Sequence, residues 1–140
     1  MSQQPLVADV ALDVRLECLD ETGRGHHLQS VLAYHHQDPF AVTMTFLTPD
    51  ESLTWTFGRE LLIEGLLRTA GDGDVCIAPA VSPNGRQVVI ITLSSPDGRL
   101  MLQARKDQIA EFVDRSLGVV PLGMETHSLD IDALVDQLLD

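Results

Sequence analysis

Apolar and polar side chains alternate at the start of the chain, as they do in a strand that is buried on one face. In residues 10–18, every second side chain is apolar and falls on one face, while charged side chains fall on the other. Three more runs rich in β-forming residues follow at 27–35, 41–47 and 53–57, with turn-forming sequences between them. Four strands joined by short turns predict an antiparallel meander.

The period of the pattern then changes to that of a helix. In residues 58–69, "GRELLIEGLLRT", apolar side chains recur three or four positions apart and charged side chains line another face. Gly65 lies inside this segment, where glycine costs about 1 kcal/mol relative to alanine. Two explanations stay open: close approach of the helix to a sheet or to another subunit, and a glycine that is merely tolerated.

The second half of the chain repeats this order. Residues 74–79, 87–94 and 100–104 have the composition of strands, with "SPNGR" and "SPDGR" as the turns between them. A helix is predicted over 106–118, where Gly118 suits the C-terminal cap. A third helix, which packs on its own domain or on a neighbour, is indicated by apolar residues at i, i+3, i+4, i+7 and i+8: Ile131, Leu134, Val135, Leu138 and Leu139.

These elements predict an α+β fold: a meander and a helix, a second meander and a helix, and a C-terminal helix. The chain has 140 residues, which is the commonest size for one domain, and 44% of them are hydrophobic. No linker or low-complexity tract interrupts the pattern. We therefore expect a single domain over residues 1–140.

The charge of the chain disfavours nucleic acid and anionic lipid as partners. The net charge is −12, and the nine basic residues are scattered singly along the sequence except for the pair Arg105 and Lys106. The longest aliphatic run, "VVII", is far shorter than the roughly 20 residues of a membrane helix, and "MSQQPL" does not have the pattern of a signal peptide. Cys18 and Cys76 form no CxxC motif, so we expect a cytoplasmic protein with free thiols and Cys18 in the core.

No motif predicts catalysis, a metal or a cofactor. The glycines of "GDGDV", residues 71–75, follow a helix instead of preceding one, so this segment is interpreted as a helix cap and turn. The pairs His26-His27 and His35-His36 flank one predicted strand, where adjacent side chains point to opposite faces and chelate poorly. There is no HExxH, Cys/His knuckle or GxSxG motif. The prediction is a protein without catalytic, metal or cofactor residues.

Binding to other proteins is the function class that remains. The loop 121–125 is a candidate partner surface, with Pro121, Gly123 and Glu125 as its residues, because a glycine lets a partner's backbone approach closely. A plain turn between helices is the alternative. Gly65 and the apolar helix faces are the candidate oligomer contacts.

The sequence resembles the SsgA-like proteins of actinobacteria from about residue 10 to residue 139. The resemblance rests on five segments in this order and at these spacings: "DPFAVTMTF", "LTWTFGRELLIEGL", "GDGDV", "ITLSSPDG" and "VPLGMETHSLDID". It implies a whirly-like fold of two antiparallel sheets, each followed by a helix, in a homotrimer. Whirly-like halves have four strands each, so a fourth strand of the second half is expected near residues 80–82.

The resemblance also implies a function in sporulation-specific cell division. Members of this family act as adaptors that help to localise the division GTPase FtsZ or to promote its assembly, and no catalysis is attributed to them. It implies FtsZ, other division proteins or SsgA-like paralogues as partners, at division septa. The alternative is the single-stranded nucleic-acid binding of whirly relatives, which a chain with −12 charge and 4% aromatic residues is not expected to share.

Overall fold

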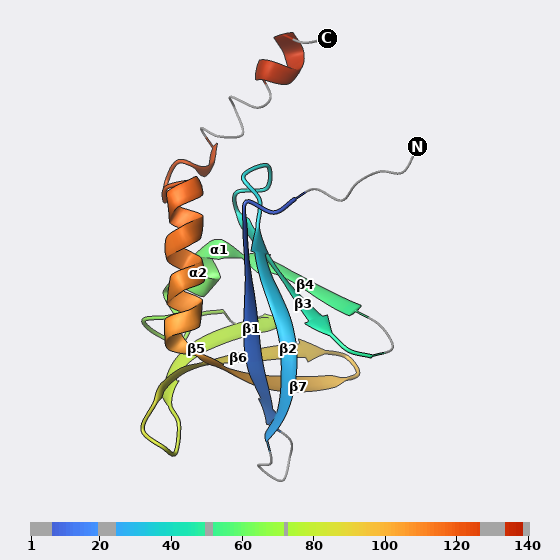
Figure 1. Cartoon of the computed structure of the whole chain (residues 1–140), viewed down its shortest axis with the longest axis vertical. Coiled ribbons are helices and arrows are strands. Elements are labelled where there is room, and N and C mark those ends of the chain that lie inside the picture. The colour runs from blue at the N-terminus through green and yellow to red at the C-terminus, as the bar shows by residue number, and fades with distance from the viewer. Residues whose placement is uncertain (1–6, 20–24, 50–51, 72, 127–133, 139–140) are drawn as a thin grey trace.

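A computed structural model of the chain describes residues 7–19, 25–49, 52–71, 73–126 and 134–138. It confirms an α+β fold in which four strands, a helix, three strands and a second helix follow one another (Figure 1). The elements are β1 (Val10–Leu19), β2 (Gly25–Tyr34), β3 (Ala41–Leu47), β4 (Ser52–Gly58), α1 (Arg59–Gly65), β5 (Val75–Val81), β6 (Gln87–Ser95), β7 (Gly98–Arg105) and α2 (Lys106–Val119).

The strands form one sheet, so the expected division into two sheets is wrong. Their order is β4-β3-β2-β1-β7-β6-β5, and all neighbours are antiparallel. Residues 17–19 of β1 pair with residues 101–103 of β7, and this short ladder joins the two meanders. Beyond it the meanders diverge, and the strands β5, β6 and β7 run across the direction of β1 and β2 (Figure 1).

The expected fourth strand of the second meander is also absent from the described residues. Ala80 and Val81 are the last residues of β5, paired with Val88 and Gln87 of β6. Ser82 begins the turn that follows, because its carbonyl accepts a hydrogen bond from Gly85 N (2.8 Å).

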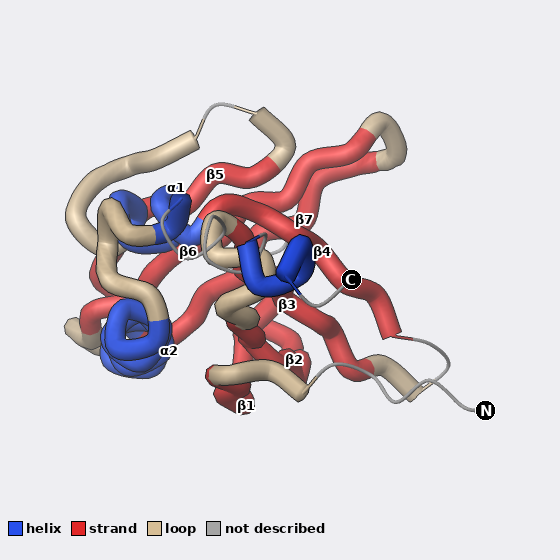
Figure 2. Tube along the Cα trace, turned by 90° about the horizontal axis from the view of Figure 1, so that it is seen from above, coloured by secondary structure: helices blue, strands red, loops and turns tan. Residues whose placement is uncertain are grey.

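The core lies between the sheet and the two helices, which cover the same side of it (Figure 2). The alternation in β1 places Val14 and Leu16 there with no exposed surface, as the pattern of apolar residues predicts. Helix α2 buries Ile109, Phe112 and Val113 against β1, β6 and β7. Cys18 packs against this core, and both cysteines are free thiols.

Helix α1 is shorter than predicted and ends at Gly65. A Cβ atom on this glycine would lie 2.3 Å from Ile77 Cγ2, so α1 approaches the sheet more closely than any other residue would allow. After the helix, Ala70 forms two backbone hydrogen bonds with Ile77 (2.8 and 2.9 Å) and covers part of the edge of β5. Close approach to a sheet is therefore the explanation of Gly65, and its contact with another subunit stays a prediction.

The two other glycines that were predicted to cap helices, Gly71 and Gly118, do not occupy caps. Gly71 has φ +88° and lies six residues beyond Gly65, the last residue of α1, so it caps no helix. Helix α2 continues through Gly118 to Val119 and its cap is Val120. The C-terminal helix is described only at residues 134–138, which are helical and exposed; Ile131 and Leu139 lie outside the described residues.

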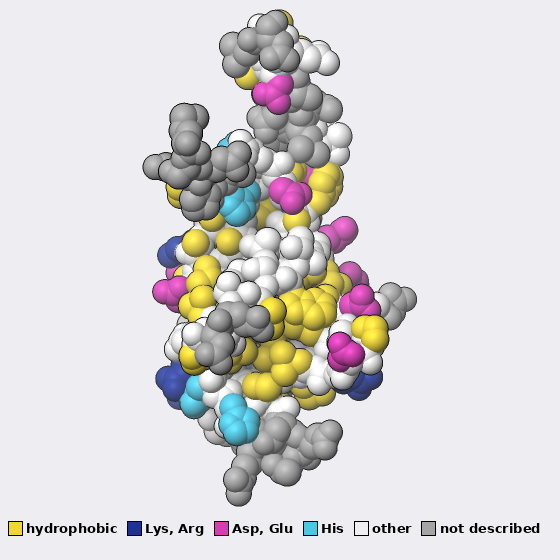
Figure 3. Space-filling view, turned by 90° about the vertical axis from the view of Figure 1, so that its right-hand side faces the viewer, with side chains coloured by type: hydrophobic (Ala, Val, Ile, Leu, Met, Phe, Trp, Pro, Cys, Tyr) yellow, Lys and Arg dark blue, Asp and Glu magenta, His cyan; other side chains and the backbone are white. Residues whose placement is uncertain are grey.

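One side of the molecule carries a broad exposed apolar area. Figure 3 looks at the side that lies away from α2, and hydrophobic side chains form a broad area in its centre with charged side chains at its margins. Among the residues of the described strands, Leu47 and Leu53 are half exposed and Met101 is 38% exposed. Contiguous apolar surface of this kind commonly marks a contact with another protein.

Candidate protein-interaction surface

The most deeply buried charge among the described residues is Arg59, which is 1% exposed. It follows β4 directly and begins α1, on the same helical face as the buried residues Leu62 and Gly65. Since isolated charges are not tolerated in a protein interior, its guanidinium must be paired and hydrogen-bonded. Those partners come from the other end of the chain.

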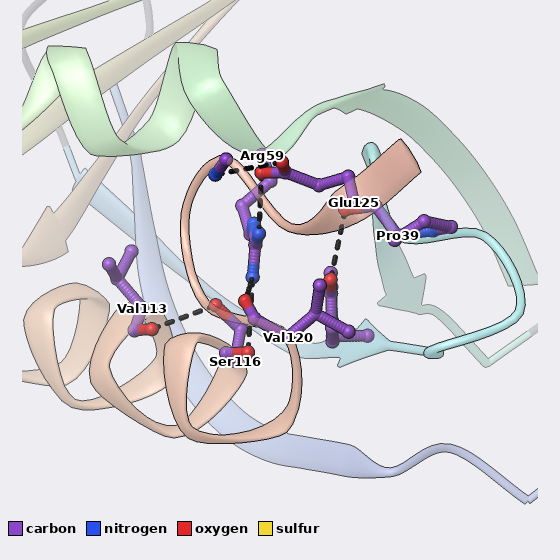
Figure 4. Close-up of polar contacts among 8 residues, drawn as sticks. Pro39, Arg59, Val113, Ser116, Val120 and Glu125 are labelled. Carbon is purple, nitrogen blue, oxygen red and sulfur yellow. Dashed lines mark hydrogen bonds and ion pairs between the residues drawn. The ribbon is translucent and has the colours of Figure 1, made fainter. Parts of the chain in front are cut away.

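The Arg59 guanidinium joins α1 to the end of α2 (Figure 4). One nitrogen, Nη1, donates to the carbonyls of Ser116 (3.0 Å) and Val120 (2.7 Å). The Ser116 carbonyl also accepts from Val120 N (3.0 Å). The carbonyls at the C-terminal end of a helix carry partial negative charge, so a buried cation is well placed there. The other nitrogen, Nη2, donates to Glu125 Oε1 at 2.8 Å, which completes a buried ion pair.

The ring of Tyr34 closes the other side of this guanidinium. Arg59 Cζ lies 4.8 Å from the ring centroid, within the range of a cation–π contact. The Tyr34 hydroxyl donates to the carbonyl of Pro39 (2.9 Å), so the tyrosine also fixes the end of the loop before β3. Burial raises the pKa of Tyr34, although the charge of Arg59 opposes that change. We call Tyr34, Arg59, Ser116, Val120 and Glu125 the Arg59 cluster.

Glu125 holds the chain segment that follows α2. Its Oε1 accepts from Arg59, and its Oε2 accepts from the backbone N–H of Gly123 (2.9 Å). Burial acts to raise the pKa of Glu125, but hydrogen bonds from the backbone and from Arg59 outweigh it, and the pKa is lowered from 4.5. Glu125 is therefore ionised at neutral pH, although only 8% of its surface is exposed.

The segment held in this way is a tight turn. Met124 N donates to the carbonyl of Pro121 (3.0 Å), and Gly123 has φ +88°, a value that favours glycine. Of the three residues predicted for the partner surface, Pro121 and Gly123 are exposed and Glu125 points inward. The carboxylate of Glu125 positions the turn and offers little surface to a partner.

Exposed apolar side chains surround the turn. Leu122 is 61% exposed and Met124 is 43% exposed, while Phe40, in the loop before β3, is 52% exposed. Leu122 and Phe40 line one pocket of about 390 Å³, together with Gly58 and Gly123. We call Phe40, Pro121, Leu122, Gly123 and Met124 the turn surface. Sequence analysis identified its glycine and proline but missed its apolar side chains and the arginine beneath them.

The described residues contain no candidate metal site. Within residues 7–19, 25–49, 52–71, 73–126 and 134–138, no three His, Cys, Asp or Glu side chains converge as ligands of one ion. His36 Nδ1 instead pairs with Asp9 Oδ2 (2.9 Å), and hydrogen bonds from the His36 backbone and ring lower the pKa of Asp9. His26 and His27 lie near the start of β2. None of the helices in this part of the chain has the length and apolar character needed to cross a membrane.

Comparison with known proteins gives one consistent result. A family model described as "Streptomyces sporulation and cell division protein, SsgA" matches residues 28–125. The sporulation-specific cell division protein SsgB of Kineococcus radiotolerans is 39% identical over 132 residues, which is 94% of this chain and 80% of that protein. SsgB of Streptomyces coelicolor is 41% identical over 109 residues, which is 77% of this chain and 79% of that protein.

Solved structures agree with this result. An SsgA-like sporulation-specific cell division protein from Thermobifida fusca superposes with a TM-score of 0.83 and 34% identity, covering 91% of this chain and 93% of that one. A structure from work on SsgB mutations that correlate with longitudinal division in Streptomyces coelicolor superposes with a TM-score of 0.81 and 36% identity, covering 85% and 94%. Fold and sequence thus define a sporulation and cell-division protein. The chain belongs to the SsgA family.

Proposed function

We propose that this protein is a non-enzymatic adaptor in sporulation-specific cell division, which binds FtsZ or another division protein at the septum. The relatives named above are sporulation-specific cell division proteins. The observation that carries the adaptor mechanism is the turn surface, where Leu122 and Met124 stand exposed on a turn that a buried ion pair holds in place, and Phe40 is exposed beside them in the loop before β3. Preorganised apolar side chains of this kind are typical anchors of protein interfaces.

The Arg59 cluster explains how the turn surface keeps its shape. The turn has few backbone hydrogen bonds of its own, and Glu125 ties it to Arg59, which is itself tied to the end of α2. A partner that binds Leu122 and Phe40 therefore meets a surface that loses little conformational entropy on binding. This arrangement suits recognition and assigns no chemical step to the site.

The adaptor acts as a homotrimer in this proposal. The inward faces of α1 and α2 form the core, so we propose that the trimer contacts lie on the opposite face of the sheet, where Leu47 of β3 and Met101 of β7 are exposed. Light scattering during gel filtration should give three times the chain mass for the natural protein. Leu47→Glu should lower that mass, and a monomeric natural protein would contradict the trimer.

The direct test of the proposed function is copurification from sporulating cells. An affinity-tagged full chain should retain FtsZ or another division protein, and the Leu122→Glu variant should retain much less. Leu67→Glu is the matched control, because Leu67 is 70% exposed in the turn after α1, outside the turn surface. Failure to recover any division protein with the natural chain would count against the adaptor function.

A further inference from the structure

A second pocket lies where the two meanders separate. It has a volume of about 560 Å³, and its walls come from β1, the β5–β6 turn, β7 and the first turn of α2. The turn surface lies past the other end of α2, which has 14 residues and is therefore about 21 Å long. The two sites are thus separate features of the chain.

The register of the sheet explains why the pocket opens there. In the ladder between β1 and β7, Glu17 pairs with Gln103. Two residues further along, continued pairing would place Arg15 directly opposite Arg105. Like charges opposite each other destabilise a strand pair, and the ladder ends before this position. Both arginines line the pocket that results.

The pocket is a basic region on an acidic protein. Arg86 from the β5–β6 turn joins Arg15 and Arg105 in its wall, against one acidic residue, Glu17. Arg105 is paired with Asp107 (2.6 Å), but in the described part of the chain neither Arg15 nor Arg86 has a carboxylate partner. The basic residues are scattered along the sequence, but the fold brings three of them from distant parts of the chain into the wall of one pocket.

The rest of the pocket offers groups that an anion alone would not use. Gln108 Oε1 is buried and has no hydrogen-bond partner, so it lacks a donor. Leu16, Val88 and Ala104 are at most 4% exposed and line the same pocket, which gives it an apolar component. A buried acceptor without a donor costs free energy that a ligand N–H would recover.

We propose that this arginine pocket, lined by Arg15, Arg86, Arg105 and Gln108, binds an acidic peptide segment of a partner protein. Carboxylates of the segment pair with Arg15 and Arg86, and a backbone N–H of the segment donates to Gln108 Oε1. A small apolar side chain contacts Val88 and Ala104. This site does not depend on the turn surface or on the proposed role in division.

A peptide fits these groups better than a nucleic acid does. A phosphate backbone needs a basic groove that follows it over many nucleotides and aromatic residues on which its bases stack. The arginine pocket is a local feature, and the chain as a whole has a net charge of −12 with 4% aromatic residues. An acidic peptide requires only a few charge-assisted contacts and one donor, which the pocket provides.

The test measures fluorescence anisotropy of a labelled peptide of Asp, Glu and Leu with the full chain at low salt. We expect saturable binding, lost when Asn and Gln replace the acids. Arg15→Glu or Arg86→Glu should weaken binding about tenfold, the loss expected for one charge-assisted hydrogen bond. Arg99→Glu and Arg115→Glu change the net charge equally at exposed positions outside the pocket and should keep the natural affinity.

A second variant separates a peptide site from a simple anion site. Gln108→Leu should weaken peptide binding about threefold, because one neutral hydrogen bond is lost. Inorganic phosphate should compete poorly with the labelled peptide in this variant, as in the natural protein. Absence of saturable peptide binding, or equal losses in the Arg99 and Arg115 variants, would overturn the proposal. So would phosphate that competes as well as unlabelled peptide, or an oligothymidylate that binds the same arginines more tightly.

Discussion

The Arg59 cluster and the arginine pocket place the same side chain in opposite situations. Arg59 is 1% exposed, donates to two carbonyls and a carboxylate, and lies against an aromatic ring. Arg15 and Arg86 are exposed and have no carboxylate partner among the described residues. The first site is complete within the chain, and the second has donors that nothing in the described chain uses.

This difference separates a structural role from a role in recognition. Removing a member of a closed, buried group leaves the others without partners and destabilises the fold. Removing an exposed, unpaired side chain changes the folded chain little, so its effect is expected on binding. Substitutions at the two sites should therefore differ in which property they change, and the following predictions run from the largest expected effect to the smallest.

The largest effect is expected from Arg59→Leu. It removes the donors for Ser116, Val120 and Glu125 and leaves a buried carboxylate without its partner, so the free energy of unfolding should fall by about 3–5 kcal/mol. Urea unfolding of both proteins measures this change. Arg86→Leu is the control from the open site, and equal losses in the two variants would remove the distinction between them.

The second prediction concerns Glu125→Gln. The amide keeps the shape of the side chain but loses its charge, so at pH 7 stability should fall by about 1–3 kcal/mol. The pKa of Glu125 is lowered on folding from 4.5, so its ionised form stabilises the protein above that pH. This contribution is lost as pH falls through the folded pKa. The gap between the two proteins in urea unfolding should therefore narrow below about pH 4.5, and a gap independent of pH would contradict it.

Glycines extend the same contrast from hydrogen bonds to packing. A methyl group at Gly65 meets Ile77 at 2.3 Å, whereas a methyl group at Gly118 meets nothing within 4 Å. Gly65→Ala should destabilise the protein by about 1–3 kcal/mol through overpacking. Gly118→Ala lies in α2 and should leave stability unchanged or raise it by up to about 1 kcal/mol. Thermal unfolding of the two variants and the natural protein measures these changes. A Gly65→Ala variant as stable as the natural protein would show that α1 can move away from β5.

The smallest effect is expected from Arg15→Gln. Arg15 has no described carboxylate partner, and continued pairing of β1 with β7 would place it opposite the like charge of Arg105. Its loss should therefore change stability by less than about 0.5 kcal/mol. Urea unfolding measures this value as well. A loss comparable to that of Arg59→Leu would mean that the arginine pocket is part of the folded core.

Local patterns predict the strands and helices but not the way in which they are joined. Alternation predicts β1 because a half-buried strand has period two, and the turns between strands follow from their proline and glycine residues. The ladder between β1 and β7 joins residues more than 80 positions apart and rests on three pairs, so no local signal reveals it. The local patterns predict two meanders, and their division into two sheets was an expectation from the family resemblance.

The candidate sites show the same limit. Arg59 lies three residues before Leu62 on one helical face, and this spacing was a usable signal of burial. Its partner Glu125 is 66 residues away, so a pattern of this kind cannot identify the ion pair. The arginines of the pocket come from three separate elements. Only the ladder between β1 and β7 shows that Arg15 and Arg105 line the same pocket.

The turn surface, fixed by the Arg59 cluster, is the site at which we propose that a division protein binds. The most direct measurement is a calorimetric titration of purified FtsZ. The natural chain, the Leu122→Glu variant and the Leu67→Glu variant are each titrated separately. We expect binding by the natural chain and the Leu67 variant, and a large loss of affinity in the Leu122 variant. Equal affinities in all three proteins, or no binding by the natural chain, would contradict the proposal.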